Sequence, residues 1–410
     1  MASEKGCRQP QDGKYYLHVE QEDVKNFLFR ANIRTNSLIA EIGEKVLNGQ
    51  RLSADDGLAL YQTHDLGLLG VLACYVKQQK SGREVYFNKN IHIEPTNLCV
   101  YRCRFCSFSS KAGENNSWEH SLDDVANKAK CYQQSDISEV HIVGGVHPDR
   151  DVYYYANMLQ TVRTVLPDVH IKAFSAVELD YMFKKANVTD DDGFEILKQA
   201  GLQSIPGGGA EIFNDEIRKK ICPEKIGSQR WLDIHRAAHR ANILSNATML
   251  YGHIEKYEDR IEHIMQLRYL QDETQGFNAF IPLKFLASKN SMSYLGEQTS
   301  VEDMKNYAVT RIFLDNIPHI KAYWPMIGKE MAQMALAFGA DDIDGTIDDT
   351  TKIYSMAGAS DQQPTMTSAE MREMITAAGY EPVERDSWYR VRNRSASIAA
   401  IQPLAAAVTA

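Results

Sequence analysis

The sequence predicts an α/β protein built on a (β/α)8 barrel of the TIM type, with a helical N-terminal lead and a small C-terminal extension. Short apolar runs recur between longer segments, such as 123–134, 152–165 and 229–241, that are long enough for right-handed crossover helices. Polar or glycine-rich residues follow each apolar run directly, as they do where the carboxyl ends of parallel strands form one rim. Both observations indicate repeated βα units around a single pocket.

Eight apolar runs supply the predicted strands, and each ends in a segment that suits such a rim. The strands are expected at 91–94, 139–143, 170–174, 202–205, 246–250, 278–281, 319–323 and 342–344. Glycine or proline after any one of them could mark an ordinary turn. Because all eight runs show the same order of signals, we expect one shared site at the carboxyl ends of the strands.

The barrel is one of four predicted parts of the chain. These are a helical segment at 1–85, the barrel at 86–349, an extension at 350–393 that packs on the barrel, and a disordered tail at 394–410. The N-terminal part lacks strand-like alternation, and Ser53 and Asp56 have the spacing of a helix capping box. The extension is expected to hold a helix near 368–378 and a strand near 388–391.

The composition is that of an ordinary soluble globular protein. The 410 residues are 44% apolar and 24% charged, and the formal net charge is -9. This charge gives no general attraction for nucleic acid or an anionic membrane, so an anionic substrate would need local cations. Residues 1–15 lack the apolar core of a signal peptide, and no run of about 18 apolar residues follows. We therefore expect a cytoplasmic protein that binds neither nucleic acid nor membrane, and the oligomeric state stays open.

Three of the seven cysteines form one short motif, in which Cys99, Cys103 and Cys106 are spaced as Cys-x3-Cys-x2-Cys. A 4Fe-4S cluster has four irons, each usually held by a thiolate. Three thiolates leave one iron open, and that iron can chelate the amino and carboxylate groups of S-adenosylmethionine. The motif therefore predicts a cluster that passes one electron into the sulfonium of that molecule.

Zinc is the main alternative ligand for these cysteines. A Cys3His site would need His92 or His120 as its fourth ligand, whereas structural zinc sites commonly use two Cys-x2-Cys pairs. The remaining cysteines stand alone and are expected to be ordinary thiols; they are Cys7, Cys74, Cys131 and Cys222.

Several segments around the motif resemble the radical S-adenosylmethionine enzymes. Phe105 is an aromatic residue directly before the last cysteine, as in that superfamily, where the backbone of this residue contacts the adenine. Gly144 and Gly145 resemble the glycine segment that receives the methionine amino group, with a plain turn as the alternative. Within the superfamily the chain is most similar to the aminofutalosine synthase family, which is related to dehypoxanthine futalosine cyclase and to one subunit of the F420-chromophore synthase. The segments that carry this similarity are 95–97, 174–178, 205–211, 246–255, 341–347 and 357–359.

This resemblance implies a reaction, its cofactors and its partners. The cofactors would be a 4Fe-4S cluster and S-adenosylmethionine, which is consumed, and an external one-electron donor of the flavodoxin or ferredoxin type would reduce the cluster. The 5'-deoxyadenosyl radical would add to the enolpyruvyl double bond of 3-(1-carboxyvinyloxy)benzoate, a small dicarboxylate. Rearrangement and loss of a carboxylate would give 6-amino-6-deoxyfutalosine for menaquinone biosynthesis.

The rim segments supply further candidate residues. Ser175, Glu178 and Glu211 are candidates for binding S-adenosylmethionine, although the first two also fit a helix cap with a first-turn carboxylate. Acid or base groups are offered by His253, Glu255 and Asp344, for which structural hydrogen bonds are the alternative. The candidates for the substrate carboxylates are Arg218, Lys284, Lys321 and Arg385. The basic run that begins at Arg218 and continues through Lys219, Lys220 and Lys225 also fits a solvated helical face.

Two alternatives to the synthase are open at this point. A related cyclase would abstract hydrogen and close a ring on dehypoxanthine futalosine. A protein of another class, a non-catalytic iron-sulfur or zinc protein, could use the same three cysteines.

Overall fold

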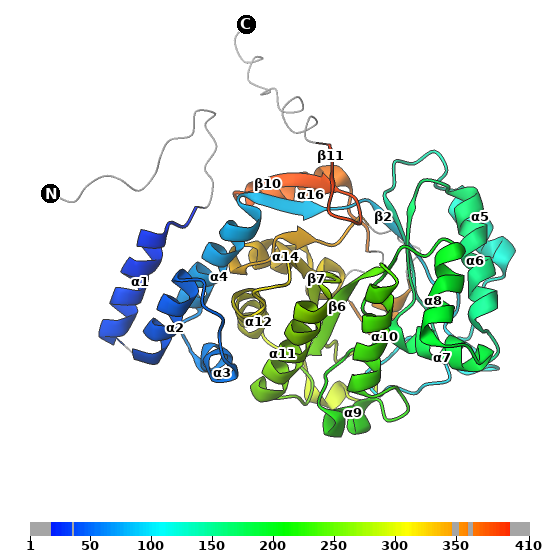
Figure 1. The fold of residues 1–410 in the computed structure, drawn as a ribbon, viewed down its shortest axis with the longest axis horizontal. Coiled ribbons are helices and arrows are strands. Elements are labelled where there is room, and N and C mark those ends of the chain that lie inside the picture. The colour runs from blue at the N-terminus through cyan, green and yellow to red at the C-terminus, as the bar shows by residue number, and fades with distance from the viewer. Residues whose placement is uncertain (1–17, 35–36, 347–351, 360–363, 394–410) are drawn as a thin grey trace, which may run out of the picture.

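The computed structural model describes residues 18–34, 37–346, 352–359 and 364–393. Cys7 and the tail predicted at 394–410 lie outside these residues. The described chain folds around one curled, mostly parallel sheet, with the first helices gathered at one end of the molecule (Figure 1). None of the described helices combines the length and the apolar character that crossing a bilayer requires.

The N-terminal part is helical up to residue 81. Its helices are α1 (Gln21–Arg34), α2 (Ser37–Leu47), α3 (Ala54–Gln62) and α4 (Leu66–Ser81). The capping box predicted from Ser53 and Asp56 is confirmed, since each side chain accepts a hydrogen bond from the other residue's backbone N–H at the start of α3. Helix α4 packs on α12 through its buried leucines, which ties this part to the sheet domain.

All eight predicted strands are present and lie side by side in chain order. They are β2 (Asn90–Ile93), β3 (Glu139–Ile142), β4 (His170–Ala173), β5 (Ser204–Ile205), β6 (Leu244–Tyr251), β7 (Phe277–Lys284), β8 (His319–Ala322) and β9 (Asp342–Ile343). Each pairs in parallel with the next. The α/β class and the repeated βα pattern are thus confirmed.

Helices connect these strands, as parallel pairing requires. They are α5 (Leu122–Lys130), α6 (Val152–Val165), α7 (Ala176–Ala186), α8 (Asp190–Gln199), α9 (Asp215–Ile221), α10 (Ser228–Arg240), α11 (Tyr257–Thr274), α12 (Ser300–Phe313), α13 (Trp324–Ile327) and α14 (Lys329–Ala335). Two short 3-10 helices, η1 (Ser293–Leu295) and η2 (Leu336–Phe338), lie in the loops before α12 and β9. The last helices are α15 (Ile353–Ala357) and α16 (Ser368–Ala377).

The sheet differs from the predicted barrel in one respect: the described strands form an open order rather than a closed ring. Strand β1 (Glu84–Phe87), in the part predicted to be helical, pairs in parallel with β9 on one side and with β10 (Glu381–Arg385) on the other. Strand β11 (Val391–Asn393) then pairs antiparallel with β10. Because β1 occupies the edge that β9 would offer to β2, the sheet runs β11-β10-β1-β9-β8-β7-β6-β5-β4-β3-β2.

Thr346 bridges the gap between the two ends of the expected ring, and its backbone N–H donates to the Asn88 carbonyl oxygen at 3.2 Å. The Thr346 hydroxyl accepts a hydrogen bond from the Asn90 N–H and donates one to the Asn90 carbonyl oxygen. Gly345 approaches Asn90 so closely that a Cβ would overlap its side chain. The sheet is therefore curled enough to bring the segment after β9 against β2 without a ladder between them.

The turn between β10 and β11 covers the amino ends of β3 and β4. The Ser387 hydroxyl donates to Glu139, the first residue of β3, and the Trp388 ring lies 4.4 Å from that of His170, the first residue of β4. The strand predicted at 388–391 is instead a turn, in which Asp386 N–H donates to the Arg390 carbonyl, and β11 begins only at Val391. In Figure 1 β10 and α16 lie at the opposite end of the molecule from α9.

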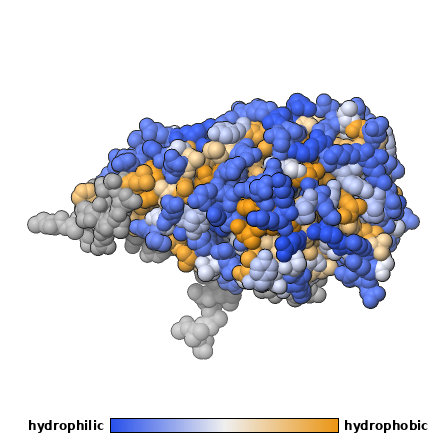
Figure 2. All heavy atoms as spheres, turned by 90° about the horizontal axis from the view of Figure 1, so that it is seen from below, coloured by the Kyte–Doolittle hydropathy of each residue, from blue (hydrophilic) through white to orange (hydrophobic). Residues whose placement is uncertain are grey.

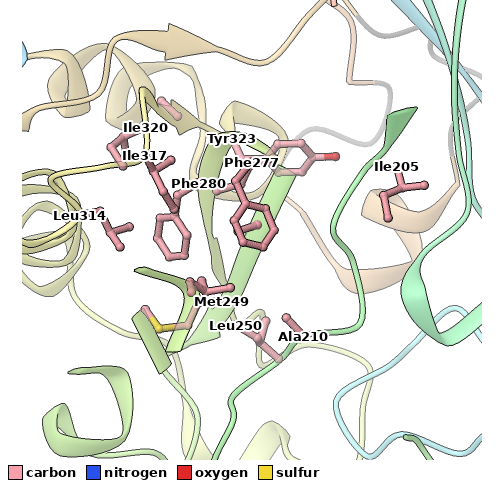
Figure 3. Packing of buried hydrophobic residues seen from close by; sticks show 14 of the residues in the cluster. Ile205, Ala210, Met249, Leu250, Phe277, Phe280, Leu314, Ile317, Ile320 and Tyr323 are labelled. Atoms are coloured by element: carbon pink, nitrogen blue, oxygen red, sulfur yellow. The ribbon is translucent and has the colours of Figure 1, made fainter. Parts of the chain in front are cut away.

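The core lies between the sheet and its helices. Figure 3 shows Met249 of β6, Phe280 of β7 and Ile320 of β8 with Leu314 and Ile317 of the loop before β8, all of them fully buried. Packing of this kind stabilises a fold by about 25 cal/mol for each Å² of apolar surface removed from water. This packing fixes the direction of each strand and therefore the position of its carboxyl end.

Candidate active site at the carboxyl ends of the strands

The cysteine motif lies on the loop that follows β2, and backbone hydrogen bonds hold this loop together and anchor it to neighbouring segments. The Cys99 N–H donates to the Ser110 carbonyl within the loop. The Val100 N–H donates to Val146 after β3, and the Arg104 N–H donates to Ile221 at the end of α9. The loop is thus fixed against two neighbouring rim segments.

The three thiols of this loop are free and partly exposed. Burial raises the pKa of Cys103 to about 12 and also raises the pKa of Cys99, while the nearby Lys225 ammonium opposes both shifts. A metal ligand must be deprotonated, and the positive charge of bound iron favours the thiolate. Three free thiols on one fixed loop are the donor set that a 4Fe-4S cluster with one open iron requires.

The Cys3His zinc site considered above is not assembled in the structure. Among the described residues, no three or more His, Cys, Asp or Glu side chains are gathered to hold a metal ion, and this includes the three thiols of the cysteine loop. His92 is directed into the sheet interior, where its Nε2 lies 3.3 Å from Nδ1 of His141. His120 packs against the ring of Trp118 instead.

Lys225 and Glu211 lie beside the cysteine loop. The Lys225 ammonium donates to Glu211 at 2.6 Å and lies 5.3 Å from the centre of the Phe105 ring. Burial by itself would lower the pKa of Lys225, but Cys103 and Glu211 raise it well above its ordinary value. This lysine, which the sequence pattern suggested to be solvent-exposed, is therefore a fixed cation next to the thiols.

Gly144 and Gly145 bring the loop after β3 against the loop after β2. The Gly145 N–H donates to the Thr96 carbonyl at 2.7 Å. A Cβ at Gly144 would lie 2.8 Å from that same oxygen, and one at Gly145 would overlap the Leu98 carbonyl. Only glycine allows the two backbones to approach this closely.

Glu178 joins the next rim segment to this pair of glycines. It forms a capping box with Ser175 at the start of α7, and its second oxygen accepts the Gly144 N–H at 3.1 Å. Burial raises the pKa of Glu178 to about 7, although its hydrogen bonds to Ser175 and Gly144 oppose the shift. Ser175 and Glu178 thus form the helix cap that the sequence offered as the alternative to binding S-adenosylmethionine. Glu178 in addition links this cap to the glycine segment.

His253 and Glu255 lie together but are occupied by local contacts. The Glu255 carboxylate accepts the Gly252 and His253 N–H groups and is paired with Arg260 at 2.7 Å. Both ring nitrogens of His253 contact backbone, at Leu250 and Ile254, and burial lowers its pKa. These two side chains hold the loop after β6 in shape.

Asp344 and Lys321 form an ion pair inside the curled sheet. The Lys321 ammonium lies 2.9 Å from Asp344 Oδ1, while Asp344 Oδ2 is buried without a hydrogen-bond partner. Burial would raise the pKa of Asp344, but the charge of Lys321 holds it below its ordinary value. His92 and His141 lie close enough to Asp344 to interact with it electrostatically.

The other three candidates for substrate carboxylates are bonded within the protein. Arg218 donates to the backbone carbonyls of Ala210, Ile212 and Ile226. Lys284 is paired with Asp303 at 2.8 Å. Arg385 is paired with Asp342 and belongs to the segment that covers the amino ends of the strands, so the structure places it away from the rim.

Comparison with known proteins places the chain in a family. Residues 93–267 match the model of the Radical SAM superfamily, and residues 274–398 match that of the CofH/MqnC C-terminal region. The chain is 43% identical over 353 residues to the aminodeoxyfutalosine synthase of Thermus thermophilus, covering 85% of this chain and 94% of that protein. The chain belongs to the radical SAM superfamily. Its cofactors are therefore a 4Fe-4S cluster and S-adenosylmethionine as co-substrate.

Two further relatives of known name are similar to this chain over most of its length. The aminodeoxyfutalosine synthase of Streptomyces coelicolor is 37% identical, with 86% of this chain and 93% of that protein covered. The 5-amino-6-(D-ribitylamino)uracil--L-tyrosine 4-hydroxyphenyl transferase of Methanoculleus marisnigri is also 37% identical, with 86% and 97% covered.

Two crystal structures share the fold at lower sequence identity. Methylornithine synthase (PylB) gives a TM-score of 0.65 at 16% identity, covering 83% of this chain and 97% of that one. The hydrogenase maturase HydG from Carboxydothermus hydrogenoformans gives 0.68 at 17% identity, covering 90% and 84%.

Proposed function

We propose that this chain is an aminofutalosine synthase. It would add the 5'-deoxyadenosyl radical to the enolpyruvyl double bond of 3-(1-carboxyvinyloxy)benzoate and, after rearrangement and loss of a carboxylate, release 6-amino-6-deoxyfutalosine for menaquinone biosynthesis. The observation that carries the proposal is the 43% identity to the Thermus thermophilus aminodeoxyfutalosine synthase over 94% of that protein. A cytoplasmic location and an external one-electron donor of the flavodoxin or ferredoxin type belong to the same proposal.

Cys99, Cys103 and Cys106 would hold the 4Fe-4S cluster. When bound, such a cluster supplies the single electron that cleaves the carbon-sulfur bond of S-adenosylmethionine. The anchored loop supports this assignment, because its three thiols are free and its backbone is fixed to the neighbouring rim segments. Lys225 would offset part of the negative charge that three thiolates bring to the site.

The residues proposed for S-adenosylmethionine divide into those that would touch it and those that would position them. Phe105 and the backbone of Gly144 and Gly145 would contact the adenine and the methionine end. Glu178 would hold the glycine segment through its bond to the Gly144 N–H. Glu211 would act through Lys225, the partner of its carboxylate.

For the substrate we propose Lys321 and Asp344, while Lys284 would need to exchange its Asp303 partner. Oδ2 of Asp344 is buried without a hydrogen-bond partner, so it would be available to accept a proton or a hydrogen bond from the substrate. Arg218 and Arg385 no longer belong to the proposal, because their guanidinium groups are bonded to backbone carbonyls and to Asp342. His253 and Glu255 would act as supports of the loop rather than as acid and base.

A second candidate function rests on the 37% identity to the Methanoculleus marisnigri hydroxyphenyl transferase over 97% of that protein. Anaerobic reactions with S-adenosylmethionine and dithionite separate the possibilities. One reaction receives 3-(1-carboxyvinyloxy)benzoate, a second receives 5-amino-6-(D-ribitylamino)uracil with tyrosine, and a third receives dehypoxanthine futalosine. We expect turnover of the benzoate alone. Consumption of either other substrate in its place would reject the synthase.

A further inference from the structure

A hollow of about 460 Å³ lies between the cysteine loop and the loop after β7. Cys103 and Cys106 line it, and so do the cations Arg102, Arg104 and Lys289. None of the described residues that line it is an aspartate or a glutamate. The hollow is therefore basic, although the whole chain carries a formal charge of -9.

Two of these cations have no carboxylate partner among the described residues. Arg104 donates to the Lys220 carbonyl oxygen at 3.4 Å, and Lys289 donates to the Ser355 carbonyl at 3.2 Å. Only Arg102 is near an acid: its guanidinium lies 3.5 Å from Glu114, and its backbone N–H donates to the Glu224 carboxylate at 2.8 Å. Ion pairs inside the protein thus leave most of this positive charge available to a partner.

Hydrogen bonds between two loops hold the cations around the thiols. Ser291 donates to the Arg104 carbonyl oxygen through both its N–H and its hydroxyl. The Ser107 hydroxyl donates to the Ser288 carbonyl at 3.2 Å. The loop after β7, which carries Lys289, is therefore fixed to the cysteine loop. The face that carries α9, seen from below in Figure 2, is mostly hydrophilic with scattered apolar residues.

We propose that this basic hollow is the surface on which an acidic one-electron carrier protein docks. A local patch of one sign on a protein of the opposite net charge steers a complementary partner to that patch. Here the patch surrounds two of the thiols proposed to hold the cluster, so docking would place the carrier's redox group next to it. One electron would leave the carrier, which is oxidised, and enter the cluster, which is reduced, with no atom transferred. The inference rests on the proposed cluster site but not on the identity of the substrate.

The test uses the cluster-reconstituted full chain and an acidic flavodoxin as the probe. The double variant Arg104→Glu/Lys289→Glu reverses both unpaired cations. We expect flavodoxin affinity, measured by titration calorimetry, and the rate of cluster reduction by photoreduced flavodoxin each to fall at least about tenfold at low salt. The difference from the wild type should shrink as ionic strength rises. Cluster reduction by dithionite should be unchanged, because dithionite needs no docking surface.

Lys185→Glu is the matched control. Lys185 is exposed in the last turn of α7, and α7 begins at the rim and runs away from it. This variant should bind and accept electrons like the wild type. Unchanged flavodoxin affinity and reduction in the double variant, or an equal loss in the control, would overturn the proposal. A failure of the synthase proposal would appear separately, as absent product in dithionite-driven reactions while flavodoxin binding persists.

Discussion

The two ends of the sheet differ in how their polar side chains are partnered. At the amino ends, Lys172 lies 2.6 Å from Glu139 and Arg385 is paired with Asp342, and all four side chains are buried. At the carboxyl ends, the three thiols of the cysteine loop are free and partly exposed. Buried ion pairs give the amino end the character of a stabilising region, whereas free and partly exposed thiols give the carboxyl end that of a working site.

The largest effect that tests this contrast is expected from Cys103→Ala. The variant should lose essentially all turnover and most of its bound iron, because two thiolates do not hold a cubane with one open iron. Its melting temperature should stay within about 2 °C of the wild-type apoprotein, since the loop lies on a rim rather than in the core. Iron analysis, product assays and calorimetry measure the three quantities. Cys131→Ala, at an exposed thiol on the C-terminal end of α5, is the control and should change none of them. Full activity of reconstituted Cys103→Ala would defeat the assignment.

Arg385→Met should show the reverse pattern at the amino end. It leaves the Asp342 carboxylate buried without its main partner, which should lower the free energy of unfolding by about 3 kcal/mol. Arg390→Met removes an exposed pair with Asp386 and should cost below about 1 kcal/mol. Urea denaturation checks both values. Iron content of folded Arg385→Met protein should be normal, and an iron loss without destabilisation would break the contrast.

Acidification should also lower the free energy of unfolding, because buried histidines away from the rim must stay neutral in the folded protein. Burial lowers the pKa of His170 to about 3 and that of His239 to about 4. Because the unfolded value is about 6.5, the unfolded chain binds more protons below that pH, so stability is fully present above pH 6.5 and falls as the pH drops.

Each of these histidines should cost about 1 kcal/mol for the first pH unit below 6.5. Unfolding measured between pH 7.5 and 5.5 should therefore show a clear loss, with a shallower slope in His239→Gln. An equal slope in the variant and the wild type would show that His239 is not a buried neutral group.

The smallest effect on the fold is expected from Gly145→Ala. The added Cβ would overlap the Leu98 carbonyl and push the loops after β2 and β3 apart. We expect S-adenosylmethionine affinity to fall about tenfold, with a stability cost of about 1 kcal/mol. Gly67→Ala, in α4 where a Cβ meets only an ordinary contact, should leave the affinity unchanged. Equilibrium dialysis with labelled S-adenosylmethionine measures both, and wild-type affinity in Gly145→Ala would remove the glycine segment from the proposed site.

Much of the fold can be predicted from the sequence because its signals are local. The eight strands from β2 to β9 are short apolar runs between helices, and each was found near its predicted place. The strands β1 and β10 gave no such signal, since Glu84 opens one and Pro382 and Glu384 interrupt the other. The open order of the sheet depends on these two strands, so the departure from a closed ring could not be predicted.

The candidate site divides in the same way. The spacing of the cysteines is local and predicts the cluster loop directly. The identity of the cations near this loop depends on tertiary packing and not on local sequence. Lys225 and Arg218 belong to the same basic run, yet Lys225 lies beside Phe105 whereas Arg218 is bonded to buried carbonyls. The position of Lys225 in the loop after Pro223, outside α9, is the one sequence signal that separates it from the helical residues.

The fate of the adenosyl group tests the central claim most directly. Wild-type protein with its cluster would be incubated anaerobically with 3-(1-carboxyvinyloxy)benzoate, dithionite and S-adenosylmethionine carrying carbon-13 throughout its adenosyl part. Mass spectrometry should find the label in a product that joins the adenosyl group to the acceptor, with the loss of one carboxylate. Recovery of all the label as free 5'-deoxyadenosine would contradict the account.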